Sequence, residues 1–231
     1  MTPGGRTKTE AVRRIDFHSH SYLSDGSTSA TDMWVEAEGL SHRALAVTDH
    51  LSLEDPRPML SRLRREAGAW EGGGFRPIVG VELTKLPPRR IAPVARAARR
   101  AGAAIVVVHG ESIVERVPAG TNRAALDSGE IDVLAHPGLL EEADARLARD
   151  HDVFLEISAR RGHSLTNGLV VARARAAGAA LVVDSDAHAP EQLVPPERAR
   201  AIALGAGVPE AEADAVLLRN PARLLRRCGG G

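Results

Sequence analysis

Two histidines at the end of the first apolar stretch are the first residues in the sequence that could do chemistry. His18 and His20 lie in the segment IDFHSHSYLSDGS, residues 15–27. In an extended strand, side chains two positions apart point to the same face, so both imidazoles would lie on one side of the backbone. Two imidazoles placed in this way can bind one cation. The pair therefore indicates a metal site if further ligands reach the same place.

Similar residues follow the other apolar stretches of the chain. Six of the nine histidines come directly after such a stretch, whereas His42, His151 and His163 do not. We expect His42 and His151 to be surface residues. One histidine at a strand end is more often structural than a metal ligand, but the repeated placement predicts a common site. The residues in these positions are Asp16, His18, His20, Asp49, His50, Glu82, His109, His136, Glu156, Asp186 and His188.

This set of side chains is too large for one metal ion. Tetrahedral zinc takes about four ligands, so six imidazoles and several carboxylates imply two or three divalent ions. Imidazole with carboxylate suits zinc, manganese or iron. Clustered ions lower the pKa of a shared water toward about 7 and make hydroxide available at neutral pH. Three such ions, offset by three carboxylates and one hydroxide, keep roughly two positive charges, which suits a phosphate monoester dianion.

The segments that would position these ligands alternate between strand-like and helix-like patterns. Seven apolar runs begin roughly 21–33 positions apart, the length of one strand and one helix with their loops. Ala-, Leu- and Arg-rich segments with helical spacing separate the runs. This alternation predicts a seven-unit α/β barrel or, alternatively, a doubly wound open sheet. In a barrel the carboxyl ends of all strands meet at one face, where the ligands would converge.

Length, charge and cysteine content limit the possible functions. The 231 residues suffice for one large domain, and 30 basic residues balance 30 acidic ones, so no net charge favours nucleic acid or a membrane surface. The single cysteine, Cys228, excludes a disulfide framework. No apolar run reaches the roughly 18 residues of a membrane span, and the first residues lack the apolar part of a signal peptide. We therefore expect a cytoplasmic protein with no membrane or nucleic-acid partner.

The motifs that carry these ligands resemble, in order, those of the polymerase and histidinol phosphatase (PHP) superfamily of metal-dependent phosphoesterases. They are DFHSHSYLSDG, TDH, GVELT, VVHGE, LAHPG, LEIS and DSDAH. The resemblance implies a distorted (β/α)7 barrel of the PHP type with a three-metal site. We expect a single PHP domain over residues 1–231, with the barrel at about 14–190 and a helical segment at about 190–228. In that segment, Asn220 would cap the last helix and Pro221 would open it.

The resemblance also implies which residues hold which metal ion. Some relatives have a histidine near Asp25, and some relatives with the SDG variant hold only two ions, so the third ion is the open part of this prediction. Asp16 and Asp49 would orient ligand histidines. The implied ligands are His18, His20, Glu82 and Asp186 for the first ion, Glu82 with His109 and His136 for the second, and Asp25, His50 and His188 for the third.

The expected reaction is hydrolysis of a phosphate monoester of a small metabolite by attack of a metal-bridging hydroxide. We assign Glu82, Asp186 and His188 as the catalytic residues. Arg160, Arg161 and His163 follow the sixth strand directly in the sequence, and we expect them to bind the phosphate. Arginine suits this role because its guanidinium pairs with two phosphate oxygens at once. Solvated arginines are common, so Arg161 is the weaker candidate of the two. Arg116 and residues 121–123 would lie on loops of the same face and are weaker still.

Two alternative functions stay open at this point. A phosphodiesterase or nuclease acting on short nucleotides would use the same metal site, although zero net charge and few aromatic residues disfavour it. A non-catalytic PHP scaffold subunit would have eroded metal ligands, whereas the ligand set here is complete. Glu156 and Ser158 could be structural or functional. The oligomeric state, the substrate and the metal in the cell are left open by the sequence.

Overall fold

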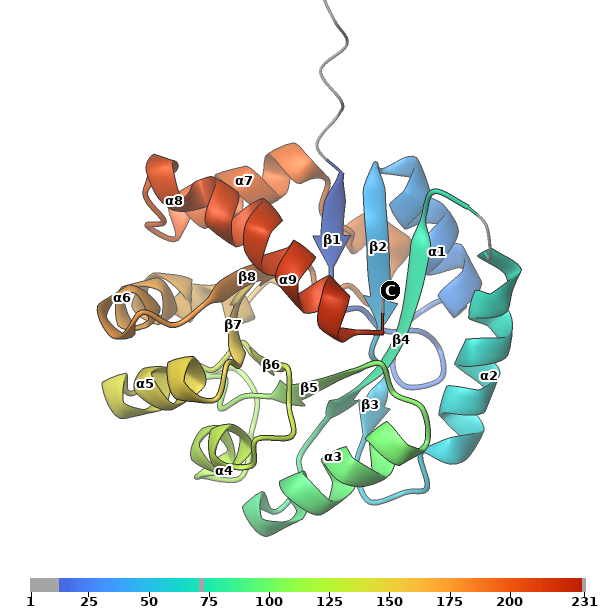
Figure 1. Cartoon of the computed structure of the whole chain (residues 1–231), viewed down its shortest axis with the longest axis horizontal. Coiled ribbons are helices and arrows are strands. Elements are labelled where there is room, and N and C mark those ends of the chain that lie inside the picture. Colours follow the sequence, from blue (N-terminus) through green and yellow to red (C-terminus); the bar gives the residue numbers. More distant parts are fainter. Residues whose placement is uncertain (1–12, 71–72, 230–231) are drawn as a thin grey trace, which may run out of the picture.

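Parallel strands and helices alternate along the chain in the computed structural model, which describes residues 13–70 and 73–229. The strands within these ranges are β1 (Arg14–Asp16), β2 (His42–Val47), β3 (His50–Leu51), β4 (Arg76–Leu83), β5 (Ile105–His109), β6 (Val133–Ala135), β7 (Phe154–Ser158) and β8 (Leu181–Asp184). Every ladder between them is parallel, in the order β1-β2-β4-β5-β6-β7-β8, and β3 pairs with β4 beside this path. The sheet curls into a nearly closed barrel (Figure 1).

Side chains close the seam between the first and last strands. Only one backbone bridge, between Ser19 and Ala187, links these two ends of the sheet in the described part of the chain. Instead, the backbone nitrogen of Phe17 donates to Asp184 Oδ1 at 2.8 Å, and the nitrogen of Ser185 donates to Asp16 Oδ1 at 3.2 Å. Carboxylates thus replace ladder partners where the barrel is distorted. The expected seven-unit barrel is confirmed, and the doubly wound alternative is wrong.

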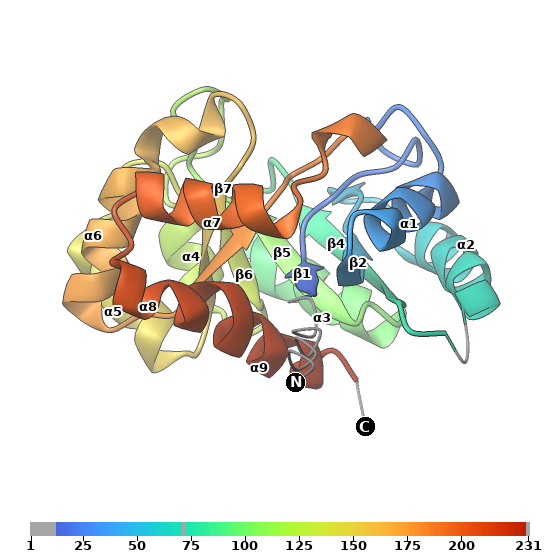
Figure 2. The same ribbon diagram turned by 90° about the horizontal axis from the view of Figure 1, so that it is seen from above.

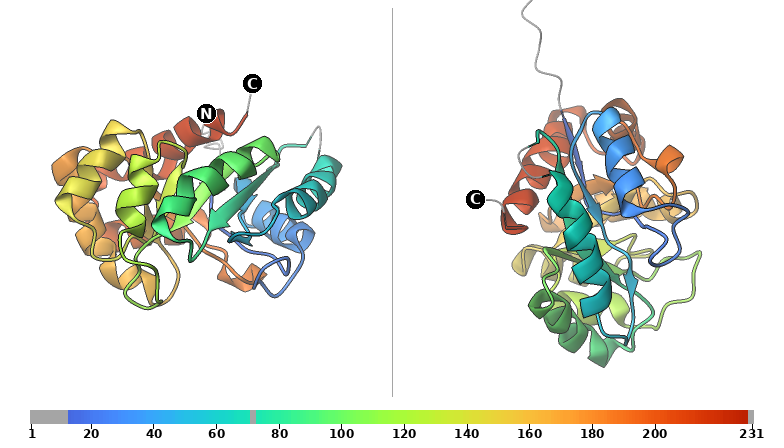
Figure 3. Two further views of the ribbon diagram at one scale, coloured as in Figure 1. Left: turned by 90° about the horizontal axis from the view of Figure 1, so that it is seen from below. Right: turned by 90° about the vertical axis from the view of Figure 1, so that its right-hand side faces the viewer.

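Helices cover the outside of this barrel. Neighbouring helices pack against one another from α1 to α2 and from α3 to α6, which gives an outer ring (Figures 1 and 3). Buried Val, Leu, Ile and Ala side chains fill the layer between strands and helices. The helices are α1 (Ala30–Gly39), α2 (Arg57–Ala67), α3 (Ile91–Arg100), α4 (Thr121–Asp127), α5 (Glu142–Asp150), α6 (Asn167–Ala177), α7 (Pro196–Gly205), α8 (Glu210–Asp214) and α9 (Asn220–Arg227).

Local sequence explains where several of these helices begin and end. Ser29 caps α1, because its hydroxyl accepts a hydrogen bond from the backbone nitrogen of Asp32 at 3.0 Å. Gly178 ends α6 with φ of 72°, a left-handed conformation that glycine adopts without strain. None of the described helices has the length and apolar character that a membrane crossing requires.

The last helix closes the amino-terminal end of the barrel. Leu224 and Leu225 of α9 and the following Cys228 pack with a second set of apolar side chains from inside the barrel, among them Ile15 and Phe17. Figure 2 shows α9 on one side of the strands and the long loops that follow β1 and β7 on the other. Because one end of the barrel is sealed, the opposite end, where the strands end, remains for a functional site.

Three local expectations are wrong. Residues 121–123 lie in the first turn of α4 rather than on a loop. Asn220 does not cap a separate helix: a π-helical stretch, Ala215–Arg219, runs directly into α9, and the Asn220 amide donates to the carbonyl of Leu181 at 2.8 Å. His42 is fully buried, because β2 begins inside the wall of the barrel. His151, by contrast, is exposed after α5, as expected.

Candidate metal centre

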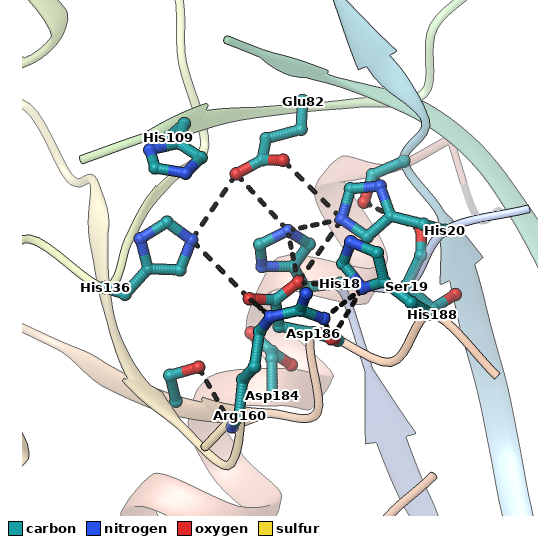
Figure 4. Close-up of polar contacts among 12 residues, drawn as sticks. His18, Ser19, His20, Glu82, His109, His136, Arg160, Asp184, Asp186 and His188 are labelled. Atoms are coloured by element: carbon teal, nitrogen blue, oxygen red, sulfur yellow. Dashed lines mark hydrogen bonds and ion pairs between the residues drawn. The ribbon is translucent and has the colours of Figure 1, made fainter. Parts of the chain in front are cut away.

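The imidazoles and carboxylates at the strand ends converge on the open end of the barrel (Figure 4). The rings of His18 and His20 approach so closely that their Nε2 atoms are 3.1 Å apart. Asp186 Oδ1 is 3.7 Å from Nε2 of His18 and 3.4 Å from Nε2 of His20. These three side chains are buried and offer ligand atoms close enough for one ion. The opening HxH motif is thus placed as the sequence predicts.

Glu82 lies between the imidazoles at the centre of this cluster. Its side chain is buried, and neither carboxylate oxygen accepts a hydrogen bond of acceptable geometry from a described residue. Nevertheless, four ring nitrogens surround it. They lie 2.8–3.5 Å from its oxygens and belong to His18, His20, His50 and His136. A buried carboxylate without hydrogen bonds is costly unless a cation compensates it.

Neighbouring oxygens fix the orientation of several of these histidines. Nδ1 of His18, on the side of the ring away from Glu82, is 2.7 Å from Glu156 Oε1, and the backbone nitrogen of His136 donates to the second oxygen of Glu156 at 2.7 Å. Nδ1 of His50, the nitrogen that faces Glu82, also lies 2.6 Å from Thr84 Oγ1. Such partners fix the tautomer and orientation of metal-binding histidines. Glu156 is therefore well placed to orient His18.

A second group of donors lies at the rim of the site, closer to solvent. Asp25 Oδ2 is 3.4 Å from Nε2 of His50, and Asp25 Oδ1 is 3.2 Å from Nε2 of His188. Together with His20, these residues offer ligand atoms that lie close enough to bind one ion. The Asp25 side chain is 53% exposed, whereas those of Glu82 and Asp186 are almost completely buried.

A third group consists of three buried imidazoles, those of His109, His136 and His163. The rings of His136 and His163 stack with centroids 4.0 Å apart. Nδ1 of His163 lies 2.6 Å from Ser112 Oγ, so its Nε2 faces the cluster. Glu115 Oε2 is 3.5 Å from Nε2 of His109. His163, which the sequence predicts to bind phosphate, thus lies among the candidate metal ligands.

Ser112 and Glu115 are residues that the sequence did not identify. They lie between β5 and α4, and no spacing rule connects this loop with the strand ends. Asn122 of α4 fixes the loop, because its Oδ1 accepts from the backbone nitrogen of Glu111 at 2.9 Å and its Nδ2 donates to the carbonyl of Pro137 at 2.8 Å. Residues 121–123 therefore support the loops after β5 and β6, and Arg123 is paired with Asp144 outside the site.

Two candidate ligands adopt a backbone conformation that costs energy. His136 has φ of 28° and Asp186 has φ of 50°, a region that side chains with a Cβ rarely occupy. Each such residue costs on the order of 1–3 kcal/mol and tends to occur at functional sites. Gly26 of the SDG motif is required for a different reason, since a Cβ there would lie 2.5 Å from the carbonyl oxygen of His20.

The two aspartates expected to orient histidine rings do not contact any ring, and this expectation is wrong. Asp16 is paired with Arg14 at 2.8 Å and accepts from the backbone nitrogen of His18 at 3.3 Å. Asp49 accepts hydrogen bonds from the backbone and hydroxyl of Ser21 and from the hydroxyl of Ser24, each at 2.7 Å. Asp49 thus shapes the loop that carries Asp25.

The arginines expected to bind phosphate differ in their contacts. Arg160 contacts His188, and its Nη1 donates to the carbonyl of Asp186 at 3.1 Å. Arg161 is exposed and lines, together with Arg160, a polar pocket of about 390 Å³ next to Asp186. Arg116 is exposed. Ser158 is buried, and its hydroxyl accepts from the backbone nitrogen of Arg160 at 3.3 Å, which is a structural role.

Electrostatic interactions within the cluster are strong. Burial opposes ionisation of Glu82, but His18 and His50 hold the pKa of this carboxyl well below its usual value. Burial alone would lower the pKa of His50, yet Glu82 and Asp25 raise it to about 10. The pKa of His18 is likewise raised, against the effect of burial, by Asp186 and Glu82. The cluster therefore attracts positive charge.

These features fit divalent metal ions. The donor set combines imidazole nitrogens with carboxylate oxygens, which is the ligand type of zinc, manganese and iron. Both carboxylate oxygens of Glu82, Nδ1 of His20 and Nδ1 of His136 are buried without a hydrogen-bond partner among the described residues. Several groups of donors, sharing His18, His20 and His136, are too many for one ion.

Comparison with known proteins supports the fold. No protein-family model matches the sequence. The histidinol phosphate phosphatase of Lactococcus lactis, solved with zinc, L-histidinol and phosphate, superposes with a TM-score of 0.61 over 84% of this chain and 94% of that chain, at 15% identity. The β-aspartyl dipeptidase of Fervidobacterium islandicum gives a TM-score of 0.54 over 91% and 72%, at 13% identity. The α/β barrel expected from the sequence is thus confirmed, and both a phosphatase and a dipeptidase share this fold.

A closer relationship exists to an archaeal protein. The uncharacterized protein MJ1295 of Methanocaldococcus jannaschii is 40% identical over 216 residues, which cover 93% of this chain and 99% of that protein. Identity at this level over nearly the full length of both chains shows that this chain belongs to the same family as MJ1295.

Proposed function

We propose that this chain is a metal-dependent hydrolase that cleaves phosphate monoesters of small metabolites. The observation that carries the proposal is the position of Glu82, a buried carboxylate without hydrogen bonds among four imidazole nitrogens. A site of this kind is stable when cations bridge the ligands. The proposal includes two or three divalent ions. Their ligands would be those that the sequence predicted, namely His18, His20, Asp25, His50, Glu82, His109, His136, Asp186 and His188.

The charge and neighbours of the site favour a phosphate over a neutral substrate. When bound, divalent ions supply Lewis acidity and hydroxide at neutral pH. The three carboxylates of the ligand set, Asp25, Glu82 and Asp186, offset only about half of the charge of three such ions. Arg160, which lies against His188 and Asp186, adds a guanidinium that can bind the phosphoryl oxygens.

The roles of the chain's own residues follow from their positions. Glu82, Asp186 and His188 lie where the groups of donors meet and would hold the reacting centre in place, while the buried rings of His18 and His136 keep bulk water away from it. His163 acts as a ligand or acceptor at Nε2 rather than as a proton donor, because burial and His136 lower its pKa to about 3.

The identity of the substrate is not carried over from the structural relatives. The Lactococcus lactis enzyme binds L-histidinol and phosphate, but its identity to this chain is 15%. At this identity the similarity shows only that the two proteins share the barrel fold. The loops that would select a substrate are the most variable parts of such folds. Histidinol phosphate is therefore one compound of the test panel rather than the proposed substrate.

A phosphatase screen with controlled metal content tests the proposal. Protein stripped with a chelator would be reloaded with zinc, manganese or iron and assayed on phosphorylated metabolites, p-nitrophenyl phosphate, bis-p-nitrophenyl phosphate and a β-aspartyl dipeptide. We expect metal-dependent release of phosphate from monoesters, and loss of this activity together with bound metal in His18→Ala. His151→Ala, at an exposed histidine outside the site, is the matched control.

Each other outcome of the screen has a defined meaning. Turnover of the diester alone would support the phosphodiesterase alternative. Hydrolysis of a β-aspartyl dipeptide but of no phosphate ester would replace the proposal by amide hydrolysis. Protein that takes up no transition metal, even at millimolar concentration, would favour a non-catalytic scaffold.

A further inference from the structure

A polar pocket borders the metal centre and is not used by the reaction described so far. It has a volume of about 390 Å³, which is within the usual size of small-molecule sites. It shares Arg160 and Asp186 with the cluster, so a molecule bound at the metals could extend into it. The charged and amide side chains that line it are Arg160, Arg161, Asp186, Glu191, Gln192 and Arg198.

Positive charge dominates the outer part of this pocket. Three of its side chains are guanidinium groups, whereas its carboxylates are Glu191 and Asp186, and Asp186 already faces His18 and His20. Neither Arg161 nor Arg198 forms an ion pair with any residue that the structure describes. Two guanidiniums without a carboxylate partner, beside one pocket, match an anionic ligand better than a neutral or cationic one.

Hydrogen bonds also connect the pocket to the metal centre. The backbone nitrogen of His188 donates to Gln192 Oε1 at 2.9 Å, which leaves the amide nitrogen of Gln192 as a donor toward a ligand. Arg160 is held by the carbonyl of Asp186 at 3.1 Å. Direct hydrogen bonds thus hold Gln192 and Arg160 of the pocket against His188 and Asp186 of the metal centre.

We propose that the substrate carries a second anionic group, a carboxylate or another phosphate, and that Arg161 and Arg198 bind this group while the scissile phosphate lies at the metals beside Arg160. This inference rests on the proposed phosphatase function and adds a substrate class to it. A cationic tail would be repelled by the same arginines, so a substrate that ends in an ammonium group should bind poorly.

Matched compounds that differ only in the end group test the inference by binding, independently of turnover. The metal-loaded protein would be titrated calorimetrically with four non-hydrolysable butyl phosphonates, whose far ends carry a hydroxyl, a carboxylate, a second phosphonate or an ammonium group. We expect the two anionic ends to bind about tenfold more tightly than the hydroxyl end, and the ammonium end most weakly. The carboxylate and phosphonate arms distinguish the two sources of anionic charge.

Variants then assign this preference to the pocket. In the double variant Arg161→Gln and Arg198→Gln, the preference for an anionic end should disappear, while Arg226→Gln, at an exposed arginine of α9, should retain it. Equal binding of all four compounds to the wild-type protein would overturn the inference, and so would a preference that survives in the double variant.

Turnover of the corresponding butyl phosphates separates this inference from the proposed function. Efficient hydrolysis with no effect of the end group would leave the phosphatase function standing and reject the second anionic group. Tight, arginine-dependent binding of the anionic phosphonates without hydrolysis of any phosphate ester would support the pocket and reject the phosphatase function.

Discussion

The seam of the barrel and its open end both bury carboxylates but compensate them differently. At the seam, between β1 and β8, Asp16 is paired with the guanidinium of Arg14 at 2.8 Å, and burial together with Asp16 raises the pKa of Asp184 well above its usual value. One carboxylate thus has a counterion, whereas burial and Asp16 disfavour ionisation of the other. At the carboxyl-terminal end, Glu82 and Asp186 face imidazoles, and no arginine or lysine neutralises Glu82 in the described part of the chain.

This difference separates a structural network from a functional one. The network at the seam is buried, and the charge of Asp16 is balanced within the protein by Arg14. The carboxyl-terminal cluster opens to solvent at Asp25 and depends on imidazoles that can release their protons to metal ions. Changes in the network around Asp16 should therefore lower the stability without altering the metal content. Changes in the cluster around Glu82 should lower the metal content without altering the stability.

The largest effect is expected for Glu82→Gln. The change removes the charge of the buried carboxylate that four imidazoles surround, so at least two metal ions should bind more weakly. Replacing a residue that only supports a metal ligand typically lowers metal affinity or activity about 10–100-fold. Replacing the ligand Glu82 itself should therefore lower the activity by more than this. Metal content by elemental analysis and phosphatase rates measure it. Glu38→Gln, on the exposed face of α1, is the control; an active Glu82→Gln protein with full metal content would contradict the bridging role.

Next in size is the effect of Arg14→Met at the seam. Removal of this guanidinium leaves Asp16 buried without its partner and the carbonyl of Val183 without its 2.9 Å donor. Breaking a buried ion pair costs about 3–5 kcal/mol, which urea unfolding would measure. Metal content and rate per folded molecule should not change, and Arg226→Gln should be neutral in both. Loss of metal without loss of stability would contradict the separation of the seam from the metal centre.

The arrangement of the ligands could be predicted because it depends on regular elements. Parallel strands in a barrel bring their carboxyl ends together, so Glu82, His109 and His136 were placed correctly although they are far apart in the sequence. The apolar runs identified the strands for the same reason, since strands buried on both faces are continuously apolar.

Residues whose roles depend on irregular structure could not be predicted. Ser112 and Glu115 reach the site through a loop, and Asp49 contacts serines rather than a ring because the turn at Gly26 folds back on His20. The position of His42 depends on which strand residues face the interior, and a one-residue change in register reverses this. The helix at 121–127 is too short for a hydrophobic period to reveal it.

The burial of His42, at the start of β2, predicts that the stability of the protein depends on pH. Burial lowers its pKa to about 4, although nearby Asp16 acts in the opposite direction. Because the unfolded chain takes up the proton near pH 6.5, this contribution to stability is fully present above pH 6.5 and is lost as the pH falls toward 4. The free energy of unfolding should fall by about 2–3 kcal/mol across this window from this residue.

His42→Gln tests this effect without touching the metal centre. Both proteins would be unfolded with urea at several pH values in the presence of chelator, so that metal release does not contribute. The variant should lose stability less steeply between pH 6.5 and 4 than the wild-type protein. Parallel curves for the two proteins would show that His42 is protonated as easily in the folded state as in the unfolded state.

The smallest effect is expected at the exposed rim. Asp25→Asn removes a carboxylate that is 53% exposed and lies 3.2–3.4 Å from His50 and His188, so it should weaken one ion and leave the buried ions in place. The rate should fall by about 10–100-fold, less than in Glu82→Gln. Asp127→Asn, at an exposed position of α4, is the control.

A second variant, Asp25→His, distinguishes a metal ligand from a structural residue of the loop. An imidazole can replace a carboxylate as a ligand of the metal ion, although it does not supply the negative charge of the carboxylate. Recovery of the metal content in Asp25→His but not in Asp25→Asn would assign Asp25 to the ion, whereas equal metal content in all three proteins would limit the metal centre to its buried half.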